Sequence, residues 1–180
     1  MIPLLAVAAA APSYRYQLDA AGSRVSARVS YFGLGNKTAR FPVMKGFIRL
    51  QPDRLDAIDL AVELDARAMT AGGKTDTDYL RGKAFFDVAN HPVVSFAGRR
   101  MVMTGATTAR VDGTISARGV TRPASLDVTF RDPPARASGR DAVLLKARTT
   151  INRRDFGMTA YSLVVGRKVT ITIDARLVPG

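Results

Sequence analysis

The sequence contains no cysteine and no tryptophan, and it has a single histidine among its 180 residues. The lack of cysteine excludes disulfides, thiolate nucleophiles and cysteine-ligated zinc. A serine-based triad has only His91 as its base, and no Gly-x-Ser-x-Gly motif accompanies it. His91 precedes Pro92, which favours extended or turn backbone, so we expect it to pack or to hydrogen-bond rather than to catalyse.

Long apolar runs and phosphate-binding glycine loops are also missing. No window of about 18 apolar residues exists, so no transmembrane helix is predicted, and there is neither a Walker sequence nor a Gly-x-Gly-x-x-Gly motif. Asp76 and Asp78 form a pair that could do acid–base work or bind a cation, but helix capping explains both without chemistry. The sequence therefore favours a binding protein over an enzyme, with no metal and no cofactor.

The charge is strongly one-sided, with a formal net charge of +12. Basic residues are scattered singly along the chain and are densest at Arg99-Arg100 and Arg153-Arg154. Nucleic-acid-binding proteins usually cluster such residues with exposed stacking aromatics, and no such cluster is present, so nucleic acid is not an expected partner. Two alternatives remain: a soluble basic surface without a specific role, or attraction to an anionic membrane or ligand head group.

The first eleven residues are apolar and uncharged and end in small side chains. This pattern predicts a signal peptide over residues 1–11, cleaved near Ala10 or Ala11, although the usual basic stretch in front of it is missing. The alternative is a first strand or the N-terminus of a cytosolic protein. Export predicts a periplasmic or secreted protein whose single domain spans residues 12–180.

Apolar side chains recur at every second position after Ser13, which is the period of a half-buried β-strand. Turn residues separate eight or nine such segments, and regular antiparallel strands with one polar face predict a β-sandwich or a closed barrel. About eight strands leave an interior wide enough for one elongated ligand. The clearest segments carry their apolar side chains at residues 25, 27, 29 and 31; at 58, 60, 62 and 64; at 126, 128 and 130; at 143, 145 and 147; and at 169, 171, 173, 175 and 177.

Residues 75–87 break this period. Thr75 or Asp76 is a plausible helix cap, and acidic residues suit the first turn of a helix. The apolar residues that follow must be buried, which predicts a short helix over one end of the barrel. Residues 152–157 form a second irregular stretch that could cover the same end.

Four blocks of the sequence resemble the YceI-like family, which consists of lipocalin-like barrels known as polyisoprenoid-binding proteins. Their order and spacing are kept over nearly all of residues 14–178. The sequence departs from the family pattern at Tyr31, where a histidine is common, at His91, where a tyrosine is common, and over residues 41–47, which lack the usual small polar residues before the glycine. The blocks are Tyr16-Gln17-Leu18-Asp19 with Ser23-Arg24-Val25-Ser26-Ala27; Thr77-Asp78-Tyr79-Leu80-Arg81 with Phe85-Phe86-Asp87-Val88 and His91-Pro92; Gly113-Thr114-Ile115 with Gly119-Val120-Thr121-Arg122-Pro123; and Ile151-Asn152-Arg153-Arg154-Asp155-Phe156-Gly157-Met158.

The resemblance implies an all-β fold: an antiparallel eight-stranded lipocalin-like barrel with a short helix over one end. It also implies that the barrel holds an apolar small-molecule lipid, an isoprenoid such as a polyprenyl phosphate or a quinone, as its bound ligand. The protein would carry or store this lipid. The alternative function is that of a structural or interaction protein whose basic surface docks on an anionic membrane or a partner. The oligomeric state stays open, a dimer included.

The ligand-binding residues are expected among the aromatic and basic side chains near the irregular end segments. Each aromatic side chain could instead simply fill the core. Arg153 could pair with Asp155 or Asp87 rather than contact a ligand, whereas an arginine can also hold a phosphate through two hydrogen bonds. The predicted site residues are Phe32, Phe41, Phe47, Tyr79, Phe85, Phe86, Phe156, Arg40, Arg81 and Arg153.

Overall fold

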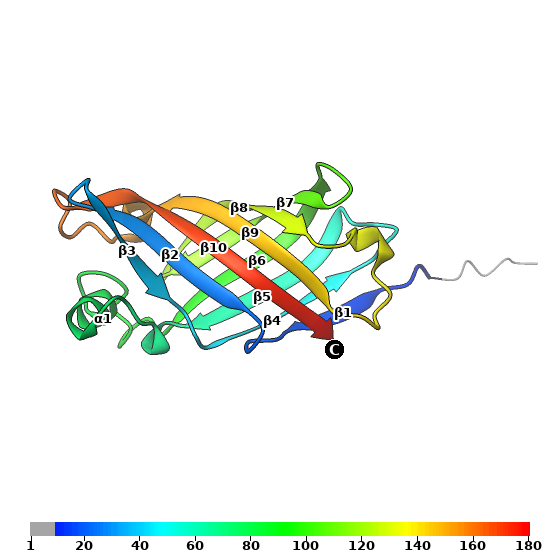
Figure 1. The fold of residues 1–180 in the computed structure, drawn as a ribbon, viewed down its shortest axis with the longest axis horizontal. Helices are drawn as coiled ribbons and strands as arrows, with labels where there is room; N and C mark the ends of the chain where they lie inside the picture. The colour runs from blue at the N-terminus through cyan, green and yellow to red at the C-terminus, as the bar shows by residue number, and fades with distance from the viewer. Residues whose placement is uncertain (1–9) are drawn as a thin grey trace, which may run out of the picture.

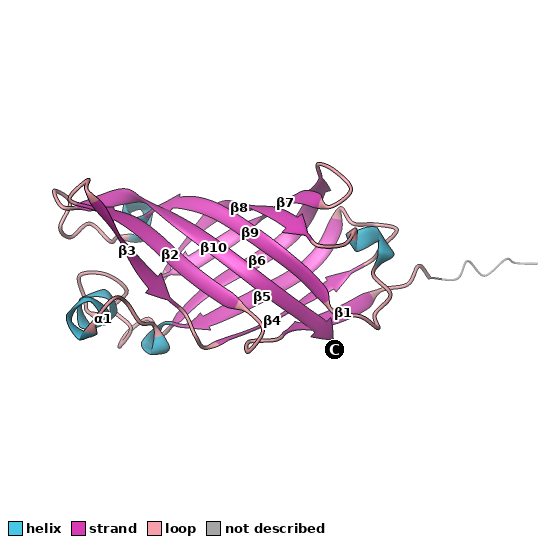
Figure 2. Cartoon of the chain, in the orientation of Figure 1, coloured by secondary structure: helices cyan, strands magenta, loops and turns pink. Residues whose placement is uncertain are grey.

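Strands make up most of the chain, as the alternation of apolar and polar side chains predicts. The computed structural model describes residues 10–180, which form one antiparallel sheet with short helices in its connections (Figure 1, Figure 2). The predicted signal peptide over residues 1–11 lies almost wholly outside the described residues. The strands are β1 (Tyr14–Leu18), β2 (Arg24–Tyr31), β3 (Gly35–Arg40), β4 (Met44–Leu50), β5 (Ala57–Asp65), β6 (Val93–Met103), β7 (Thr108–Ala117), β8 (Val120–Phe130), β9 (Val143–Asn152) and β10 (Val165–Pro179); the helices are η1 (Ala66–Ala68), α1 (Lys74–Arg81), η2 (Pro134–Arg136) and η3 (Arg153–Phe156).

Pairing of the first strand with the last closes the sheet into a barrel. Strands β4 to β10 lie side by side in chain order, and β1 pairs with β4 on one side and with β10 on the other, where Leu18 lies opposite Leu177. Every strand of this ring has two neighbours, so the ring has no free edge. The predicted closed antiparallel barrel is confirmed.

Ten strands build a barrel of eight because two pairs of them are collinear. β1 and β2 follow one another along the same edge of β10, opposite residues 177–179 and 165–174 respectively. β3 and β4 pair in the same way with β2 and β1. The first four strands therefore act as two long, interrupted ones, and the predicted number of eight is confirmed.

The side chains predicted on the buried faces point into the barrel. In β2 and β10 the apolar residues at every second position line interior cavities, and in β5, β8 and β9 they line a cavity or belong to the core. Their neighbours in sequence, such as Arg28 and Glu63, are exposed on the outer face. β10, the longest strand with 15 residues, spans about 50 Å, or roughly 35–40 Å along the barrel axis at the usual strand tilt.

The two ends of the barrel are filled differently. At the β1 end a large cluster of buried residues packs the interior, including Tyr16, Leu50 and Met101, each at most 1% exposed. The hydroxyl of Tyr16 accepts a hydrogen bond of 3.0 Å from the backbone N–H of Gly139, which satisfies its polar atom within the packing. The opposite end carries α1 (Figure 1). One end is therefore plugged, and the interior near α1 is left to smaller clusters of side chains.

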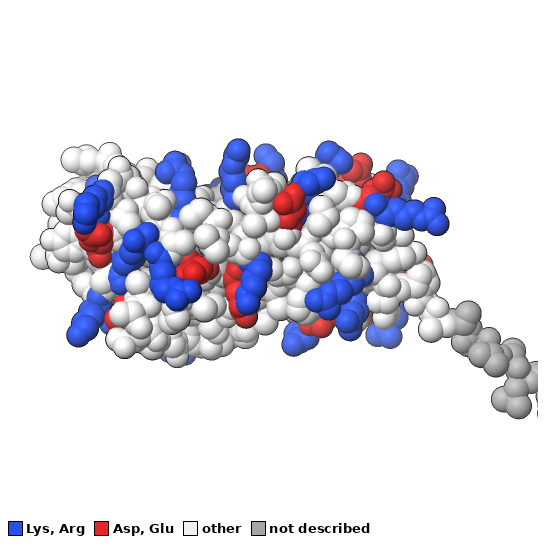
Figure 3. All heavy atoms as spheres, turned by 90° about the horizontal axis from the view of Figure 1, so that it is seen from below, with Lys and Arg blue, Asp and Glu red and all other residues white. Residues whose placement is uncertain are grey.

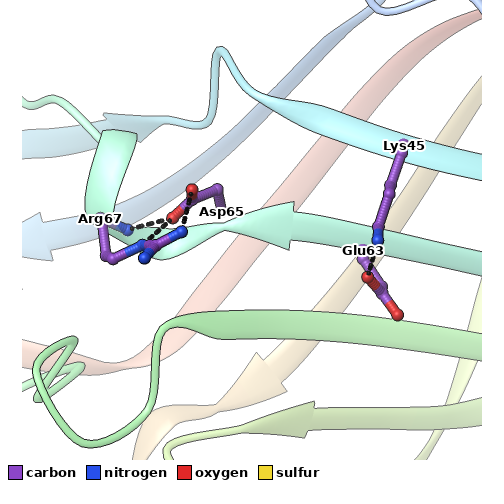
Figure 4. A network of polar contacts seen from close by, with 4 residues as sticks. All are labelled: Lys45, Glu63, Asp65 and Arg67. Carbon is purple, nitrogen blue, oxygen red and sulfur yellow. Dashed lines mark hydrogen bonds and ion pairs between the residues drawn. The ribbon is translucent and has the colours of Figure 1, made fainter.

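Charged side chains make hydrogen bonds and ion pairs at the end of β5, where the chain leaves the sheet towards α1. Asp65 accepts hydrogen bonds from both the backbone and the side chain of Arg67 and so caps η1, and Lys45 pairs with Glu63 at 2.9 Å two residues earlier (Figure 4). The hydrogen bond from the Arg67 guanidinium lowers the pKa of the Asp65 carboxyl below its usual value. Charged contacts thus mark the point where the strand stops.

α1 covers the end of the barrel as predicted, but it begins differently. It starts at Lys74 after Gly73, which offers no side-chain cap, so the prediction that Thr75 or Asp76 caps it is wrong. The Asp76 carboxylate instead bonds Lys37 of β3 at 2.6 Å. Within residues 10–180, no helix combines the length and the apolar character needed to cross a membrane.

Gly113 of β7 lies opposite Gly98 of β6, beside an irregularity in the pairing of the two strands. A Cβ at Gly113 would collide with the carbonyl oxygen of Ala97, whereas one at Gly35 would meet nothing within 4 Å. The close approach at Gly113 therefore requires glycine for steric reasons.

We expect Gly113→Ala to lower the free energy of unfolding by about 1–3 kcal/mol, the usual cost of overpacking. Gly35→Ala, the matched control, should change it by less than about 1 kcal/mol. Urea unfolding followed by circular dichroism measures both, and equal stability of the two variants would show that the strands do not depend on this contact.

Candidate functional site

A cavity of about 400 Å³ lies inside the barrel at the α1 end. Its volume is within the range of ligand-binding pockets, roughly 300–1,000 Å³. Its wall consists of mostly apolar side chains from several strands, β2 and β10 among them, together with side chains from α1 and from the residues around η3. The strand residues that line it include Val25, Ala27 and Val29 of β2 and Val165, Val169 and Ile171 of β10.

A second, smaller cavity of about 130 Å³ continues towards the packed end. It shares five lining residues with the first, and its other lining residues include members of the packed cluster such as Met101 and Phe130. The interior therefore holds two neighbouring apolar cavities, a larger one near α1 and a smaller one towards β1, with these five side chains in the wall of both. The shared residues are Val25, Leu64, Val94, Ile115 and Ile171.

Five of the predicted aromatic residues line the larger cavity: Phe41, Tyr79, Phe85, Phe86 and Phe156. Phe41, Phe85 and Phe156 are buried. Phe41 and Phe86 meet edge to face with their ring centroids 6.0 Å apart, an arrangement that aromatic pairs prefer. Their contact with a ligand stays a prediction.

Tyr161 also lines this cavity and is absent from the predicted set. It stacks on Phe85 at 5.9 Å and meets Tyr79 edge to face at 6.0 Å, and it is half-exposed. It lies in the loop between β9 and β10, where the sequence has no periodic pattern. Its nearness to the fourth family block was the only available signal.

Two predicted aromatic residues lie outside the cavity. Phe32 sits in the turn between β2 and β3, with a φ of 52° and 58% of its surface exposed. Phe47 of β4 is on the outer face because it lies one residue from the buried Ile48, and the guanidinium of Arg15 covers its ring at 4.3 Å. Neither residue lines the cavity, and their contact with a ligand stays a prediction.

Two predicted basic residues lie outside the cavity as well. Arg40 ends β3 with an exposed side chain, and its backbone pairs with Thr70. The guanidinium of Arg81 donates two hydrogen bonds, of 3.0 and 2.7 Å, to the carbonyl oxygen of Met69. Arg81 therefore holds the segment before α1 in place, and neither side chain lines the cavity.

Arg153 is the predicted basic residue that lines the cavity, and it is only 3% exposed. Asn152 caps η3 and so fixes the backbone from which Arg153 points inward. Its guanidinium donates hydrogen bonds to three backbone carbonyl oxygens, those of Gly166 (2.9 Å), Met158 (2.5 Å) and Val165 (2.9 Å). One side chain thus fastens the start and the end of the loop that connects β9 to β10.

No carboxylate pairs with Arg153 among residues 10–180, so the expected ion pair with Asp155 or Asp87 does not form. Burial, assisted by the nearby charge of Arg154, lowers the pKa of Arg153. An arginine nevertheless stays protonated in proteins. Three of its five N–H groups serve the carbonyls, and its guanidinium lies 5.8 Å from the centroid of the Phe85 ring, so a positive charge without a carboxylate partner among the described residues lines an apolar cavity.

We expect Arg153→Met to lower the free energy of unfolding by about 2–4 kcal/mol, because it leaves three carbonyls without their donor. Arg167→Met, at an exposed position of β10, is the control and should change stability by less than about 0.5 kcal/mol. Thermal and urea unfolding measure the difference. A similar, small loss in both variants would contradict the role of Arg153 as a fastener.

An ion pair closes the side of the cavity between β3 and α1. Within residues 10–180, the outer edge of β3 pairs with no strand, and its one backbone bridge joins Arg40 to Thr70. The Nζ of Lys37 on β3 lies 2.6 Å from the carboxylate of Asp76 on α1. The hydrogen bond that Lys37 donates to the Asp76 carboxylate raises the pKa of Lys37. Both side chains line the cavity and are partly exposed, and pairs of this kind contribute little stability. This is therefore a weak contact at a place where the wall lacks backbone pairing.

His91 lies outside the cavity. Its ring packs against Gly119 in the turn between β7 and β8, since a Cβ on that glycine would lie 2.9 Å from its Cε1 atom. The backbone N–H of His91 donates to the carbonyl oxygen of Asp87 at 2.8 Å. Its position is that of a packing residue in the segment that follows α1.

A closed barrel with an apolar interior, plugged at one end and lined by aromatic residues and one arginine at the other, is the architecture of lipocalin-like binding proteins. The model of the YceI-like domain family matches residues 16–177. The chain belongs to the YceI-like family, as its four sequence blocks predict.

Curated relatives and solved structures agree with this assignment. A UPF0312 protein of Pseudomonas putida is 25% identical over 145 residues, covering 79% of this chain and 76% of that protein. BcnA of Burkholderia cenocepacia has the same fold, with a TM-score of 0.78 at 19% identity over 88% of this chain and 98% of BcnA. A polyisoprenoid-binding domain from Saccharophagus degradans, implicated in plant cell wall breakdown, superposes with a TM-score of 0.69 at 15% identity over 92% of this chain and 98% of that domain.

Proposed function

We propose that this protein binds a long-chain isoprenoid-type lipid, a polyprenyl phosphate or an isoprenoid quinone, with the hydrocarbon tail inside the barrel. The observation that carries the proposal is the apolar cavity of about 400 Å³ inside the barrel, with a smaller apolar cavity next to it. The Saccharophagus degradans domain, whose fold this chain shares, is described as polyisoprenoid-binding, which supports the same class of ligand.

The energetics of such binding are favourable without many polar contacts. Transfer of each methylene from water to an apolar wall contributes about 0.8 kcal/mol. Ten buried carbons therefore contribute about 8 kcal/mol, which offsets the cost of association when that cost lies in the lower half of its range of roughly 4–15 kcal/mol. A wall of valine, isoleucine and phenylalanine side chains suits an isoprenoid tail, which offers no polar group to recognise.

The head group is placed near Arg153 and Tyr161 in this proposal. The Arg153 guanidinium has two N–H groups left after its three backbone hydrogen bonds. Both a phosphate and a quinone carbonyl can accept from such donors, so the same site suits either ligand. The tail then extends from the wide cavity towards the narrow one, away from α1.

The role that fits this binding is carriage or storage of the lipid rather than its conversion. We place the protein in the periplasm or outside the cell, on the ground of the predicted signal peptide over residues 1–11. A lipid that must cross an aqueous space needs an apolar enclosure, because its tail is nearly insoluble in water.

Native mass spectrometry of protein purified without detergent tests the proposal. We expect an added mass that organic solvent removes, and the mass and phosphorus content of the extract distinguish a polyprenyl phosphate from a quinone. A barrel that is empty in every preparation, and that takes up neither lipid when it is offered, would overturn the proposed function.

Filling the cavity from its own wall should abolish uptake. We expect Ala27→Phe to weaken binding of an isoprenoid quinone at least tenfold, because the new ring occupies space that the tail needs. Ala61→Phe is the matched control, since Ala61 lies on the outer face of β5 between inward-pointing neighbours, and it should bind as the unaltered protein does. Fluorescence or calorimetric titration measures both, and equal affinities would place the ligand elsewhere.

A further inference from the structure

Large apolar side chains are exposed at one end of the barrel. Five residues define this apolar rim, and two of them are almost fully exposed, Leu34 at 96% and Leu163 at 100%. Exposed apolar residues that stand alone need no explanation, but a contiguous group marks an interaction surface. The apolar rim consists of Phe32, Leu34, Tyr79, Tyr161 and Leu163.

The rim residues come from three segments that touch one another. The backbone N–H of Phe32 donates to the carbonyl oxygen of Val164 at 2.7 Å, so the turn between β2 and β3 lies against the loop between β9 and β10. Tyr161 of that loop meets Tyr79 of α1 edge to face at 6.0 Å. Both loops and α1 lie at the same end of the barrel in Figure 1.

The rim adjoins the cavity through two of its residues. Tyr79 and Tyr161 line the cavity and are also half-exposed, so the interior and the outer surface are continuous through them. A surface that held only another protein would have no need to join the cavity in this way. A lipid bilayer, in contrast, is where a lipid with a long tail resides.

Positive charge lies behind the rim. Lys83, Arg167 and Lys168 are exposed, and none of them forms an ion pair within the part of the chain that the structure describes. Asp76 and Asp78 of α1 are both neutralised by lysines. Figure 3 shows this end, at the left, ending in residues without charge, with lysine and arginine set back from the tip.

We propose that the apolar rim docks on an anionic lipid bilayer, with Leu34 and Leu163 inserted among the acyl chains and the cations behind them against the head groups. The cavity entrance then faces the membrane, and a tail passes between bilayer and barrel without crossing bulk water. The purpose of this docking, transfer of a lipid, rests on the proposed function. The docking itself does not, because vesicle binding is measured without a ligand in the cavity.

The double variant Leu34→Glu/Leu163→Glu tests the docking, and both side chains are so exposed that the fold is kept. We expect co-sedimentation with vesicles of phosphatidylglycerol and phosphatidylcholine to weaken about a hundredfold, because two buried leucines are replaced by charges that the membrane repels. Val43→Glu/Val102→Glu, which makes the same changes at exposed positions outside the rim, should bind as the unaltered protein does.

The sequence has no tryptophan, so Leu163→Trp introduces a single fluorescent reporter at the rim. We expect its emission to shift to the blue with these vesicles and to be quenched by brominated acyl chains, whereas Val102→Trp should show neither effect. Vesicles of phosphatidylcholine alone should bind roughly tenfold more weakly, since each lysine or arginine near an anionic surface contributes to the affinity.

Three results would overturn the docking: no vesicle binding, equal binding of the rim variant and its control, or a dimer that the rim variant breaks while vesicles leave the protein unbound. Quinone titration in detergent separates this failure from that of the proposed function. If the rim variant and the unaltered protein both bind quinone but neither binds vesicles, the docking is wrong and the proposed lipid binding stands. If the protein binds vesicles but takes up no lipid, the docking stands and the proposed function is wrong.

Discussion

The cavity exists because the sheet closes on itself, and closure depends on a short stretch of backbone pairing. β1 has five residues and shares only the last part of β10, yet it joins the two sides of the ring. The sheet could not enclose a dry interior with that seam open, since each free edge would expose backbone donors and acceptors. The dense core around Tyr16 and Leu177 lies at this seam, so the place where the ring closes is also the place where it is packed most tightly.

The remaining interior follows from the same constraint. An eight-stranded barrel has room for side chains or for one ligand, depending on the size of the residues that point inward. At the β1 end these include tyrosine, methionine and phenylalanine, which meet across the axis, whereas the β2 wall near α1 presents Val25, Ala27 and Val29. The small side chains of this wall leave space opposite the aromatic rings that line the same cavity, and Arg153 fastens the loop between β9 and β10 beside it.

Much of this architecture could be predicted from the sequence, because alternation along a strand is a local property. The inward set of β10, from Val169 to Leu177, followed from its period of two. The sequence analysis did not predict β3, because Gly35–Arg40 is polar at nearly every position and so lacks the alternation. Its outer edge has a single backbone bridge, to Thr70 in a loop. Phe32 and Phe47 were misplaced for a related reason: closeness to an irregular segment does not say on which side of the sheet a ring lies. The role of Arg153 depends on carbonyls up to 13 residues away, which no local pattern reports.

A barrel with one blind end has a single opening for both arrival and departure. Under the proposed function, a lipid that enters tail first leaves head first, and under the proposed docking the barrel has to leave one membrane before its opening faces another. Exchange under that docking is sequential, because loading and release both pass the same opening beside Tyr79 and Tyr161.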